Sequence, residues 1–258
     1  MGRHHKATAK EQMSESPLLD VQGVSKYFGG LKANDDISFQ VKKGEIVSII
    51  GPNGAGKSTL FSCVTGFYRV DKGRLLFKGR DITNRKPHTI ARLGIVRTFQ
   101  VVQVISDMTV LENVMTGGFL RCTRVDDARR KAEDILAFTG LIEKQSYNAL
   151  ELTISDKKRL EVSMALAMDP ELLMLDESMA GLTPVELRQI IELIRKVRAS
   201  SVTVVVVEHV MEAVMELSDR VIVLNSGRKI MEGTPSEVVE NLEVKRAYLG
   251  ERYSVVSQ

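Results

Sequence analysis

Nine residues between two apolar segments carry the strongest chemical signal in the sequence. GPNGAGKST, residues 51–59, follows the strand-like run 45–50 and precedes the apolar-rich stretch 60–68. Glycines let backbone N–H groups turn inward around an anion, and a helix that starts here adds the positive end of its dipole. Lys57 can then reach the outer phosphates of a nucleotide, and the Ser58 hydroxyl can hold Mg²⁺. We therefore predict a phosphate-binding loop; the alternative is a glycine-rich turn that binds nothing. Its predicted binding residues are Asn53, Gly54, Ala55, Gly56, Lys57, Ser58 and Thr59.

Two acidic residues form a second group with chemical potential. LLMLDES, residues 172–178, places Asp176 and Glu177 at the end of an apolar run. Ligands of open α/β sheets bind at the carboxyl ends of the strands, so Asp176 can serve the metal ion while Glu177 polarises an attacking water. Alone, the pair could be a solvated strand end. Together with a phosphate-binding loop in the same chain, it favours a catalytic site.

The apolar pattern predicts the elements that must bring these residues together. Strands are expected at 18–24, 37–41, 45–50, 74–77, 92–100, 172–177 and 202–209, with a hairpin at 221–233 that turns at 225–227. Thr109 and Glu112 form a capping box that opens a helix, and further helices are expected at 125–138 and 185–198. Strands that alternate with helices are typical of a parallel sheet.

The predicted fold class is therefore α/β, with a P-loop core, a mainly parallel sheet, an N-terminal antiparallel β subdomain and an inserted α-helical subdomain. Residues 17–100 and 169–258 form the core in this prediction, and residues from about 101 to 168 form the helical subdomain. Residues 1–16 are polar and lack periodicity, so we expect a disordered leader.

Composition and charge exclude several classes of protein. The 258 residues include 36 basic and 33 acidic side chains, and this net charge of +3 predicts no nucleic-acid partner. Cys63 and Cys122 lack metal-ligand spacing, which favours a reducing, cytoplasmic environment. The longest apolar run, 202–207, has the length of a strand and not of a membrane span. We expect a soluble protein that can dock to a membrane component.

Five motifs, in their order along the chain, resemble those of the ATPase subunits of ABC transporters. They are YFGG at 27–30, GPNGAGKST at 51–59, RTFQ at 97–100, LLMLDES at 172–178 and VVEH at 206–209. The resemblance covers nearly the whole chain after the leader and implies an ABC ATPase domain at 17–258. It also implies ATP and Mg²⁺ as cofactors, transmembrane permease subunits and a second ATPase subunit as partners, and a peripheral position at the cytoplasmic face of the cell membrane.

The resemblance also implies roles for individual residues. Phe28, with Tyr27 as the fallback, would stack on adenine; Gln100 would lie at the Mg²⁺ ion and the attacking water; His209 would contact the γ-phosphate. Each also has a purely structural alternative, as a core ring, a loop amide or a strand-end imidazole. The implied catalytic residues are Glu177, His209 and Gln100, and the implied metal ligands are Ser58, Gln100 and Asp176.

Further segments resemble the ATPase subunits of importers of branched-chain and related hydrophobic amino acids. They include MTVLENV at 108–114, AGLTP at 180–184 and the tail GTPSEVVENLEVKRAYLG at 233–250. An indirect link to a substrate-binding protein follows from this resemblance. We expect a permease helix to dock near residues 101–114; the alternative is that the apolar residues of this segment are core.

One motif departs from the family. LTISD, residues 152–156, stands where the family has the signature Leu-Ser-Gly-Gly-Gln, which contacts the ATP of the partner subunit. Thr153 and Ser155 are the expected contacts, while Asp156 would direct a carboxylate at a polyanion. We therefore expect asymmetric pairing with a different ATPase subunit; a nucleotide-dependent scaffold with little hydrolysis is the alternative function. A structural alternative is that Ser155 is simply a helix cap.

Overall fold

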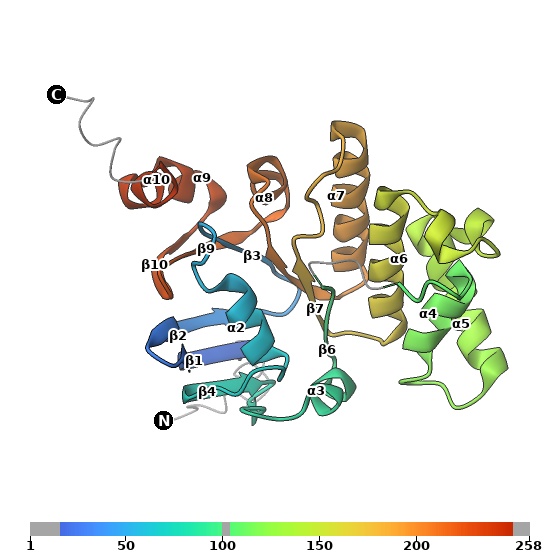
Figure 1. The fold of residues 1–258 in the computed structure, drawn as a ribbon, viewed down its shortest axis with the longest axis horizontal. Helices are drawn as coiled ribbons and strands as arrows, with labels where there is room; N and C mark the ends of the chain where they lie inside the picture. Colours follow the sequence, from blue (N-terminus) through green and yellow to red (C-terminus); the bar gives the residue numbers. More distant parts are fainter. Residues whose placement is uncertain (1–15, 100–103, 250–258) are drawn as a thin grey trace, which may run out of the picture.

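Two β-sheets are present in a computed structural model that describes residues 16–99 and 104–249 (Figure 1). Residues 1–15 of the predicted leader lie outside the described part. The first sheet is antiparallel in the order β2-β1-β4-β5. Its strands are β1 (Leu19–Phe28), β2 (Leu31–Val41), β4 (Lys72–Phe77) and β5 (Arg80–Asp81). β1 and β2 extend beyond the prediction because they continue pairing up to a hairpin turn at Gly29 and Gly30, where side chains are exposed and show no apolar alternation.

The second sheet carries the phosphate-binding loop and has the order β10-β9-β3-β8-β7-β6. All neighbours in it are parallel except β9 and β10, which form the predicted hairpin. Its strands are β3 (Ile46–Ile50), β6 (Ile95–Arg97), β7 (Leu172–Asp176), β8 (Thr203–Val207), β9 (Arg220–Asn225) and β10 (Arg228–Gly233). Every residue of β3, β7 and β8 is buried, which explains their continuous apolar runs.

Alternate side chains of this sheet enter two different cores, as the period of a strand requires. On one face, Ile49 and Val205 pack with the first sheet and with α2 (Lys57–Val64). On the other face, Val204 and Val206 pack against α7 (Pro184–Ala199). The strand that leads into the phosphate-binding loop, β3, therefore lies in a sheet that is packed on both faces. The remaining helices at the carboxyl-terminal end are α8 (Met211–Leu217), α9 (Pro235–Glu240) and α10 (Leu242–Leu249).

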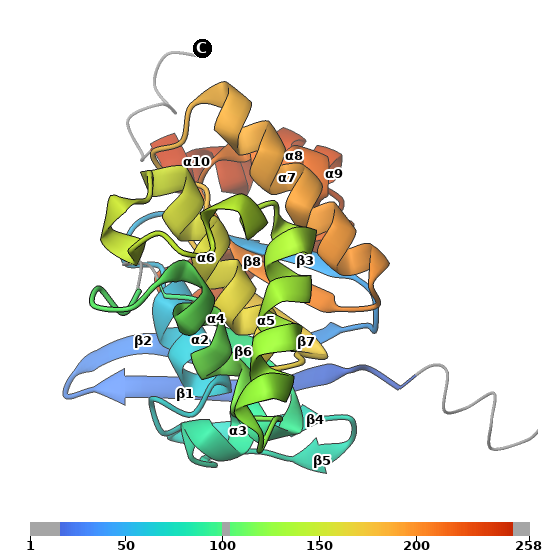
Figure 2. The ribbon, with the colours of Figure 1, turned by 90° about the vertical axis from the view of Figure 1, so that its right-hand side faces the viewer.

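The segment predicted as a helical subdomain is helical in its described part, residues 104–168, and lies beside the sheets (Figures 1 and 2). It consists of α4 (Val110–Gly118), α5 (Val125–Thr139), the short 3₁₀ turns η1 (Ile142–Lys144) and η2 (Ala149–Glu151), and α6 (Ile154–Ala167). The capping box of Thr109 and Glu112 is present, and α5 ends at Gly140 with φ 76°. Both predicted helix boundaries are confirmed.

Two sequence predictions need correction here. The strand predicted at 92–100 is reduced to β6, because α3 (Pro87–Leu93) precedes it and ends at Gly94 with φ 105°. The docking expectation near 101–114 is narrowed, because Val110 and Val114 are fully buried among the helices, as in the alternative that these residues are core, whereas Ile105 is 40% exposed. Residues 101–103 of the predicted docking segment lie outside the described part.

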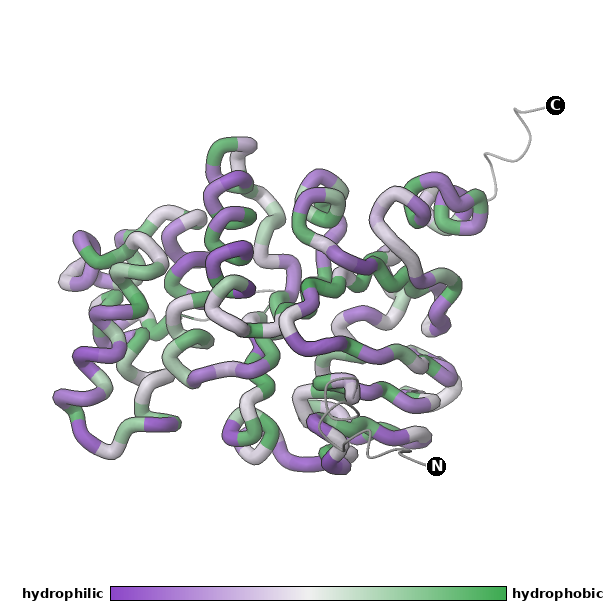
Figure 3. The backbone as a smooth tube through the Cα atoms, turned by 180° about the vertical axis from the view of Figure 1, so that it is seen from behind, coloured by the Kyte–Doolittle hydropathy of each residue, from purple (hydrophilic) through white to green (hydrophobic). Residues whose placement is uncertain are grey.

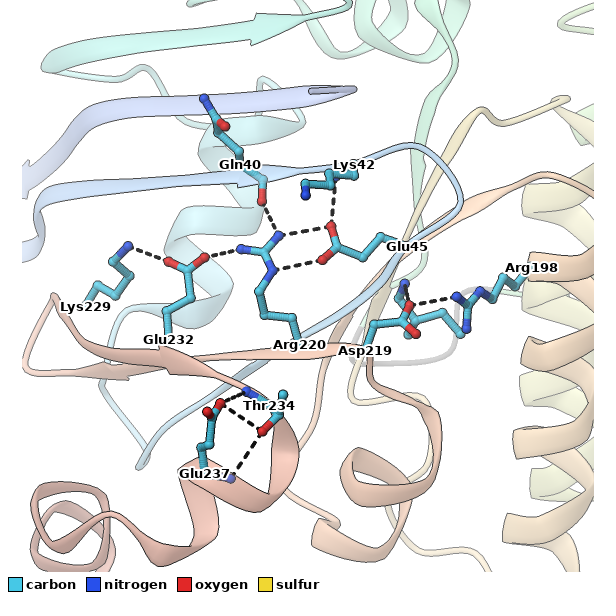
Figure 4. Close-up of polar contacts among 11 residues, drawn as sticks. Gln40, Lys42, Glu45, Arg198, Asp219, Arg220, Lys229, Glu232, Thr234 and Glu237 are labelled. Carbon is cyan, nitrogen blue, oxygen red and sulfur yellow. Dashed lines mark hydrogen bonds and ion pairs between the residues drawn. The ribbon is translucent and has the colours of Figure 1, made fainter. Parts of the chain in front are cut away.

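Charged side chains hold the hairpin β9–β10 to the rest of the core (Figure 4). Arg220 donates to Glu45 Oε1 at 2.8 Å and Oε2 at 3.0 Å, and to the carbonyl of Gln40 at 2.6 Å. It also pairs with Glu232, which Lys229 Nζ contacts at 2.6 Å. These contacts join both sheets at the edge where β3 begins.

No helix in residues 16–99 and 104–249 is both long enough and apolar enough to span a membrane. In Figure 3 hydrophilic residues interrupt the hydrophobic ones along α7, the longest helix.

Candidate functional site

The phosphate-binding loop has a backbone that only glycine allows at its key positions. Gly56 adopts φ 100°, and a Cβ atom there would lie 2.3 Å from the carbonyl oxygen of Ala33. Asn34 Nδ2 donates to the Gly56 carbonyl at 3.0 Å, and the backbone N–H of Gly227 donates to the Ala55 carbonyl at 3.1 Å. The first sheet and the hairpin β9–β10 therefore support the loop from two sides.

The loop leads directly into α2, whose N-terminus has no side-chain cap. Its first N–H groups can therefore bind an anion, with the helix dipole adding to the attraction. Lys57 is buried and donates to the carbonyl oxygens of Gly51 at 2.7 Å and Pro52 at 3.1 Å. Burial lowers the pKa of the Lys57 ammonium group, and the nearby Glu177 and Asp176 oppose this effect. The structure thus places a buried cation inside the loop.

A cavity of about 710 Å³ joins this loop to the predicted base-binding and catalytic residues. A volume of several hundred Å³ is typical of small-molecule sites. The cavity is lined by Phe28, Leu31, Lys32, Ala33, Asn53, Gly54, Ala55, Gly56, Lys57, Ser58, Thr59, Glu177 and Ser226. A larger hollow of about 1130 Å³ lies elsewhere, rimmed by Lys42, Lys43 and Lys78, and is lined by none of the predicted site residues that the structure describes.

Phe28, rather than Tyr27, lines this cavity. The Phe28 ring is 42% exposed, which rules out the alternative that it is a core residue. Its centroid lies 5.3 Å from that of Tyr68 in an edge-on arrangement, and the ammonium group of Lys26 lies 5.1 Å from it. These contacts hold an aromatic ring at the cavity rim, where a flat base can stack.

Asp176 ends β7 and is almost completely buried. Oδ2 accepts a hydrogen bond from Arg97 at 2.8 Å, whereas Oδ1 is buried without a hydrogen-bond partner among the described residues. Burial raises the pKa of the Asp176 carboxyl, and Arg97 opposes that rise. A hard divalent cation such as Mg²⁺ prefers carboxylate and hydroxyl oxygens and keeps several water ligands. The unpartnered Oδ1 and the exposed Ser58 hydroxyl fit that donor set.

Glu177 follows at the point where the chain turns away from the sheet. Its φ is 49°, and its backbone N–H donates to the Val207 carbonyl at 2.9 Å. A left-handed backbone is costly for a residue with a Cβ atom, and such strain is typical of functional sites. Nδ1 of His209 lies 3.9 Å from Glu177 Oε1. The structure therefore brings these two predicted catalytic residues together, while the third, Gln100, lies outside the described residues.

The helix that starts in the signature segment is not capped by Ser155, as the structural alternative expected. Thr153, and not Ser155, is the N-cap of α6, since Thr153 Oγ1 accepts from the Asp156 N–H at 3.2 Å. Ser155 is buried, and its hydroxyl has no hydrogen-bond partner among the described residues. The Asp156 carboxylate lies 2.5 Å from Lys144 Nζ. Neither Thr153 nor Ser155 lines the cavity at the phosphate-binding loop.

Four residues that lie inside the predicted motifs or contact them carried no assigned role in the sequence. Asn34 supports the loop, Arg97 binds Asp176, and Lys144 binds Asp156. Glu208 is buried and accepts a hydrogen bond from the Met179 N–H at 2.8 Å. Burial raises the pKa of Glu208 to about 7. Arg97 and Glu208 are charged residues in or beside apolar runs, and this was the signal that could have pointed to these two. The sequence carries no comparable signal for Asn34 or Lys144.

Comparison with known proteins agrees with this geometry. The ABC transporter family model matches residues 34–180, and the model described as "branched-chain amino acid ATP-binding cassette transporter" matches residues 228–254. The high-affinity branched-chain amino acid transport ATP-binding protein LivG of Salmonella typhimurium is 41% identical over 91% of this chain and 98% of its own length. BraF of Pseudomonas aeruginosa, with the same description, is 38% identical over 91% and 98%.

Solved structures show the same likeness. The crystal structure of a nucleotide-free ATP-binding cassette from an ABC transporter has a TM-score of 0.85 and 34% identity, covering 92% of this chain and 100% of its own. The ADP conformation of an ATP-binding cassette of an ABC transporter has a TM-score of 0.84 at the same identity and coverage. The chain therefore belongs to the ABC transporter family and is one of its ATP-binding cassette ATPases.

Proposed function

We propose that this chain hydrolyses Mg·ATP in the 710 Å³ cavity and thereby powers the import of branched-chain or related hydrophobic amino acids. The observation that carries the catalytic part is the arrangement of Asp176 and Glu177. A buried carboxylate oxygen that has no hydrogen-bond partner within residues 16–99 and 104–249 lies next to a strained residue that lines the same cavity as the phosphate-binding loop. The tail match at 228–254 and the LivG and BraF relatives support the cargo class.

Each predicted residue has a distinct task in this proposal. The loop residues and the N-terminus of α2 bind the phosphates, Lys57 exchanges its carbonyl contacts for the outer phosphates, and Phe28 stacks on adenine. Ser58 and Asp176, with Gln100, hold Mg²⁺, which neutralises charge on the phosphate oxygens when bound. Glu177 polarises the attacking water, and His209 contacts the γ-phosphate.

A second ATPase subunit completes the site in this proposal. In a head-to-tail pair, the ATP of this chain meets the signature of the partner, while the partner's ATP meets Thr153 and Ser155. The Asp156 carboxylate lies at the start of α6, paired with Lys144 and bonded to Thr153. An anion already held at a helix N-terminus opposes a second one. This observation favours a pair of two different ATPase subunits, in which the ATP site completed by LTISD hydrolyses ATP slowly.

The permease contact is proposed at the aromatic groove, a cavity of about 200 Å³ beside α3. Its lining includes Phe67, His88, Arg97, Phe99 and Met168. Phe67 is 51% exposed and Phe99 is 37% exposed, so an apolar face of a cytoplasmic permease helix can cover them. The chain would then sit peripherally at the cytoplasmic face of the membrane, linked to a substrate-binding protein only through the permease.

The test is ATP hydrolysis and amino-acid uptake by the chain assembled with its permease and second ATPase subunits in vesicles. Hydrolysis that increases with leucine-loaded binding protein, and that Glu177→Gln abolishes while ATP still binds, supports the proposal. Hydrolysis that never exceeds the Glu177→Gln background in the assembled complex, despite ATP binding, would support the scaffold function instead.

A further inference from the structure

Arg97 is a partly buried arginine that contacts an expected metal ligand directly. Its side chain is 9% exposed, and its Nη2 atom donates to Asp176 Oδ2 at 2.8 Å. β6, which carries Arg97, pairs with β7 in register so that Arg97 opposes Met174, two residues before Asp176. The guanidinium therefore reaches along the sheet edge and holds one carboxylate oxygen while Oδ1 keeps no partner among the described residues.

The same guanidinium is also connected, through Ser62, to the backbone of the other expected metal ligand, Ser58. Nη1 donates to Ser62 Oγ at 3.1 Å, and the Ser62 hydroxyl donates to the Ser58 carbonyl at 2.8 Å. Nε donates to the carbonyl of Thr98 at 3.2 Å. Arg97 thus links β7 to the first turn of α2, the two elements that carry Asp176 and Ser58. A planar guanidinium with several fixed donors is suited to such bridging.

On its opposite side Arg97 is enclosed by aromatic rings. The guanidinium carbon lies 4.9 Å from the centroid of Phe99, 5.8 Å from Phe67 and 5.9 Å from Phe61. Phe67 and Phe99 contact each other edge-on with centroids 5.6 Å apart. Both rings are partly exposed in the aromatic groove, and Arg97 itself lines that groove. One side chain therefore contacts both a surface groove and the buried carboxylate.

We propose that Arg97 is a positioning residue that orients Asp176 for Mg²⁺ and couples this carboxylate to the aromatic groove. The inference rests on the proposed function, because it assumes a metal–nucleotide complex in the cavity. Partners that orient a metal ligand typically change metal affinity by 10- to 100-fold when they are removed. In this proposal a ligand that moves Phe99 removes one of the contacts that hold the guanidinium, and thereby weakens the hydrogen bond from Arg97 to Asp176.

The experiment separates metal binding from nucleotide binding. The full chain is titrated with ADP by isothermal titration calorimetry, once in EDTA and once in excess Mg²⁺. For Arg97→Met we expect ADP affinity in EDTA within about twofold of the wild type, and a Mg²⁺-dependent gain in affinity reduced roughly tenfold. Arg97→Lys keeps the positive charge but lacks the planar set of guanidinium donors, so its Mg²⁺-dependent gain should lie between those of the wild type and Arg97→Met. Arg92→Met, at an exposed arginine on α3, is the matched control and should equal the wild type.

A second metal readout keeps the test decisive if Arg97→Met does not fold. Mn²⁺ bound to the ADP complex of Arg97→Lys, counted by electron paramagnetic resonance, should require a severalfold higher Mn²⁺ concentration than in the wild type. Phe99→Leu keeps apolar volume but removes the ring, and should weaken the Mg²⁺-dependent gain as well.

Four results would count against the inference in different ways. The positioning role would be overturned if Mg²⁺ increased the ADP affinity of Arg97→Met as much as that of the wild type. It would also be overturned if Arg97→Lys bound Mn²⁺ at the same concentration as the wild type. If the Mg²⁺-dependent gain in ADP affinity were reduced in the Arg97 variants but unchanged in Phe99→Leu, the coupling to the groove would be overturned. Absence of ADP binding by the wild type would contradict the proposed nucleotide site itself, and this inference with it.

Discussion

The carboxylate of Asp156 lies 2.5 Å from the ammonium group of Lys144, and the same oxygen accepts a hydrogen bond from Thr153 Oγ1 at 3.0 Å. The N-terminus of α6 therefore holds an anion that belongs to the chain itself. The Thr153 hydroxyl, which stands where the family signature has a serine hydroxyl, donates to this carboxylate. Lys144 offsets the negative charge, so α6 is stable although the segment departs from the family signature.

The first prediction concerns this closed helix start. In the assembled transporter, Ser155→Gly with Asp156→Gln should raise ATP turnover roughly tenfold, the effect of about 1.4 kcal/mol on the barrier. The reason is that the variant removes a negative charge from the start of α6 and frees the Thr153 hydroxyl, which now donates to Asp156, for the partner's γ-phosphate. Steady-state phosphate release at saturating ATP measures the change.

Lys144→Met is the matched control for that variant. It leaves the Asp156 carboxylate in place without its cation, so turnover should fall below the wild-type value because the negative charge is no longer offset. Unchanged turnover in both variants would show that α6 does not face the partner's nucleotide during hydrolysis.

The second prediction tests the buried lysine of the loop. Lys57→Met should weaken ATP binding by roughly 10- to 100-fold, since a hydrogen bond to a charged group contributes about 1.5–3 kcal/mol. Lys32 lines the same cavity but its side chain is 62% exposed, so Lys32→Met should change the affinity less than about threefold. Equal effects of the two substitutions in a fluorescent-nucleotide competition assay would refute the assignment of Lys57.

The third prediction separates Phe28 from Tyr27 as the adenine platform. Phe28→Ala should raise the dissociation constant of ATP roughly tenfold, because stacking of a base on an aromatic ring contributes about 1–3 kcal/mol. Phe28→Tyr should retain wild-type affinity, and Tyr27→Leu should have little effect because Tyr27 lies outside the cavity lining. A larger loss in Tyr27→Leu than in Phe28→Ala would reverse the assignment.

Local sequence was enough to predict the phosphate-binding loop and several helix boundaries. The loop is a contiguous segment whose glycines, lysine and helix start are all within nine residues. The helix caps at Thr109 and Gly140 are equally local. The length of β6 was not predictable in this way. β6 lies within the apolar pattern GIVRTF, residues 94–99, and this pattern does not show where pairing with β7 stops.

The supporting residues of the site could not be predicted, because their partners are distant in the chain. Asn34 bonds a carbonyl 22 residues away, and Arg97 bonds Asp176 across 79 residues. Such pairs exist only once the sheets have formed, and no spacing rule links them. Lys144 stands only 12 residues before Asp156, yet irregular backbone and a 3₁₀ turn lie between them, so helical periodicity could not relate the two.

The buried Glu208 leads to the fourth prediction, on pH. Its pKa rises from 4.5 to about 7 in the folded chain because burial penalises the carboxylate, although the Met179 N–H and Lys158 oppose this effect. Between these two pH values the folded chain binds more protons than the unfolded chain. The free energy of unfolding should therefore decrease as pH rises from 4.5 to 7, with a contribution of roughly 3 kcal/mol from this group.

Glu208→Gln tests this directly, because glutamine resembles the protonated carboxyl and still offers the Met179 N–H an acceptor. The variant should lose most of the decrease in unfolding free energy between pH 4.5 and 7, and at pH 8 it should be more stable than the wild type. Urea unfolding followed by circular dichroism at several pH values measures both effects. Glu212→Gln, at an exposed glutamate on α8, should reproduce the wild-type pH profile. A Glu208→Gln profile parallel to that of the wild type would show that Glu208 is ionised throughout this range, held so by Lys158 and the backbone N–H groups.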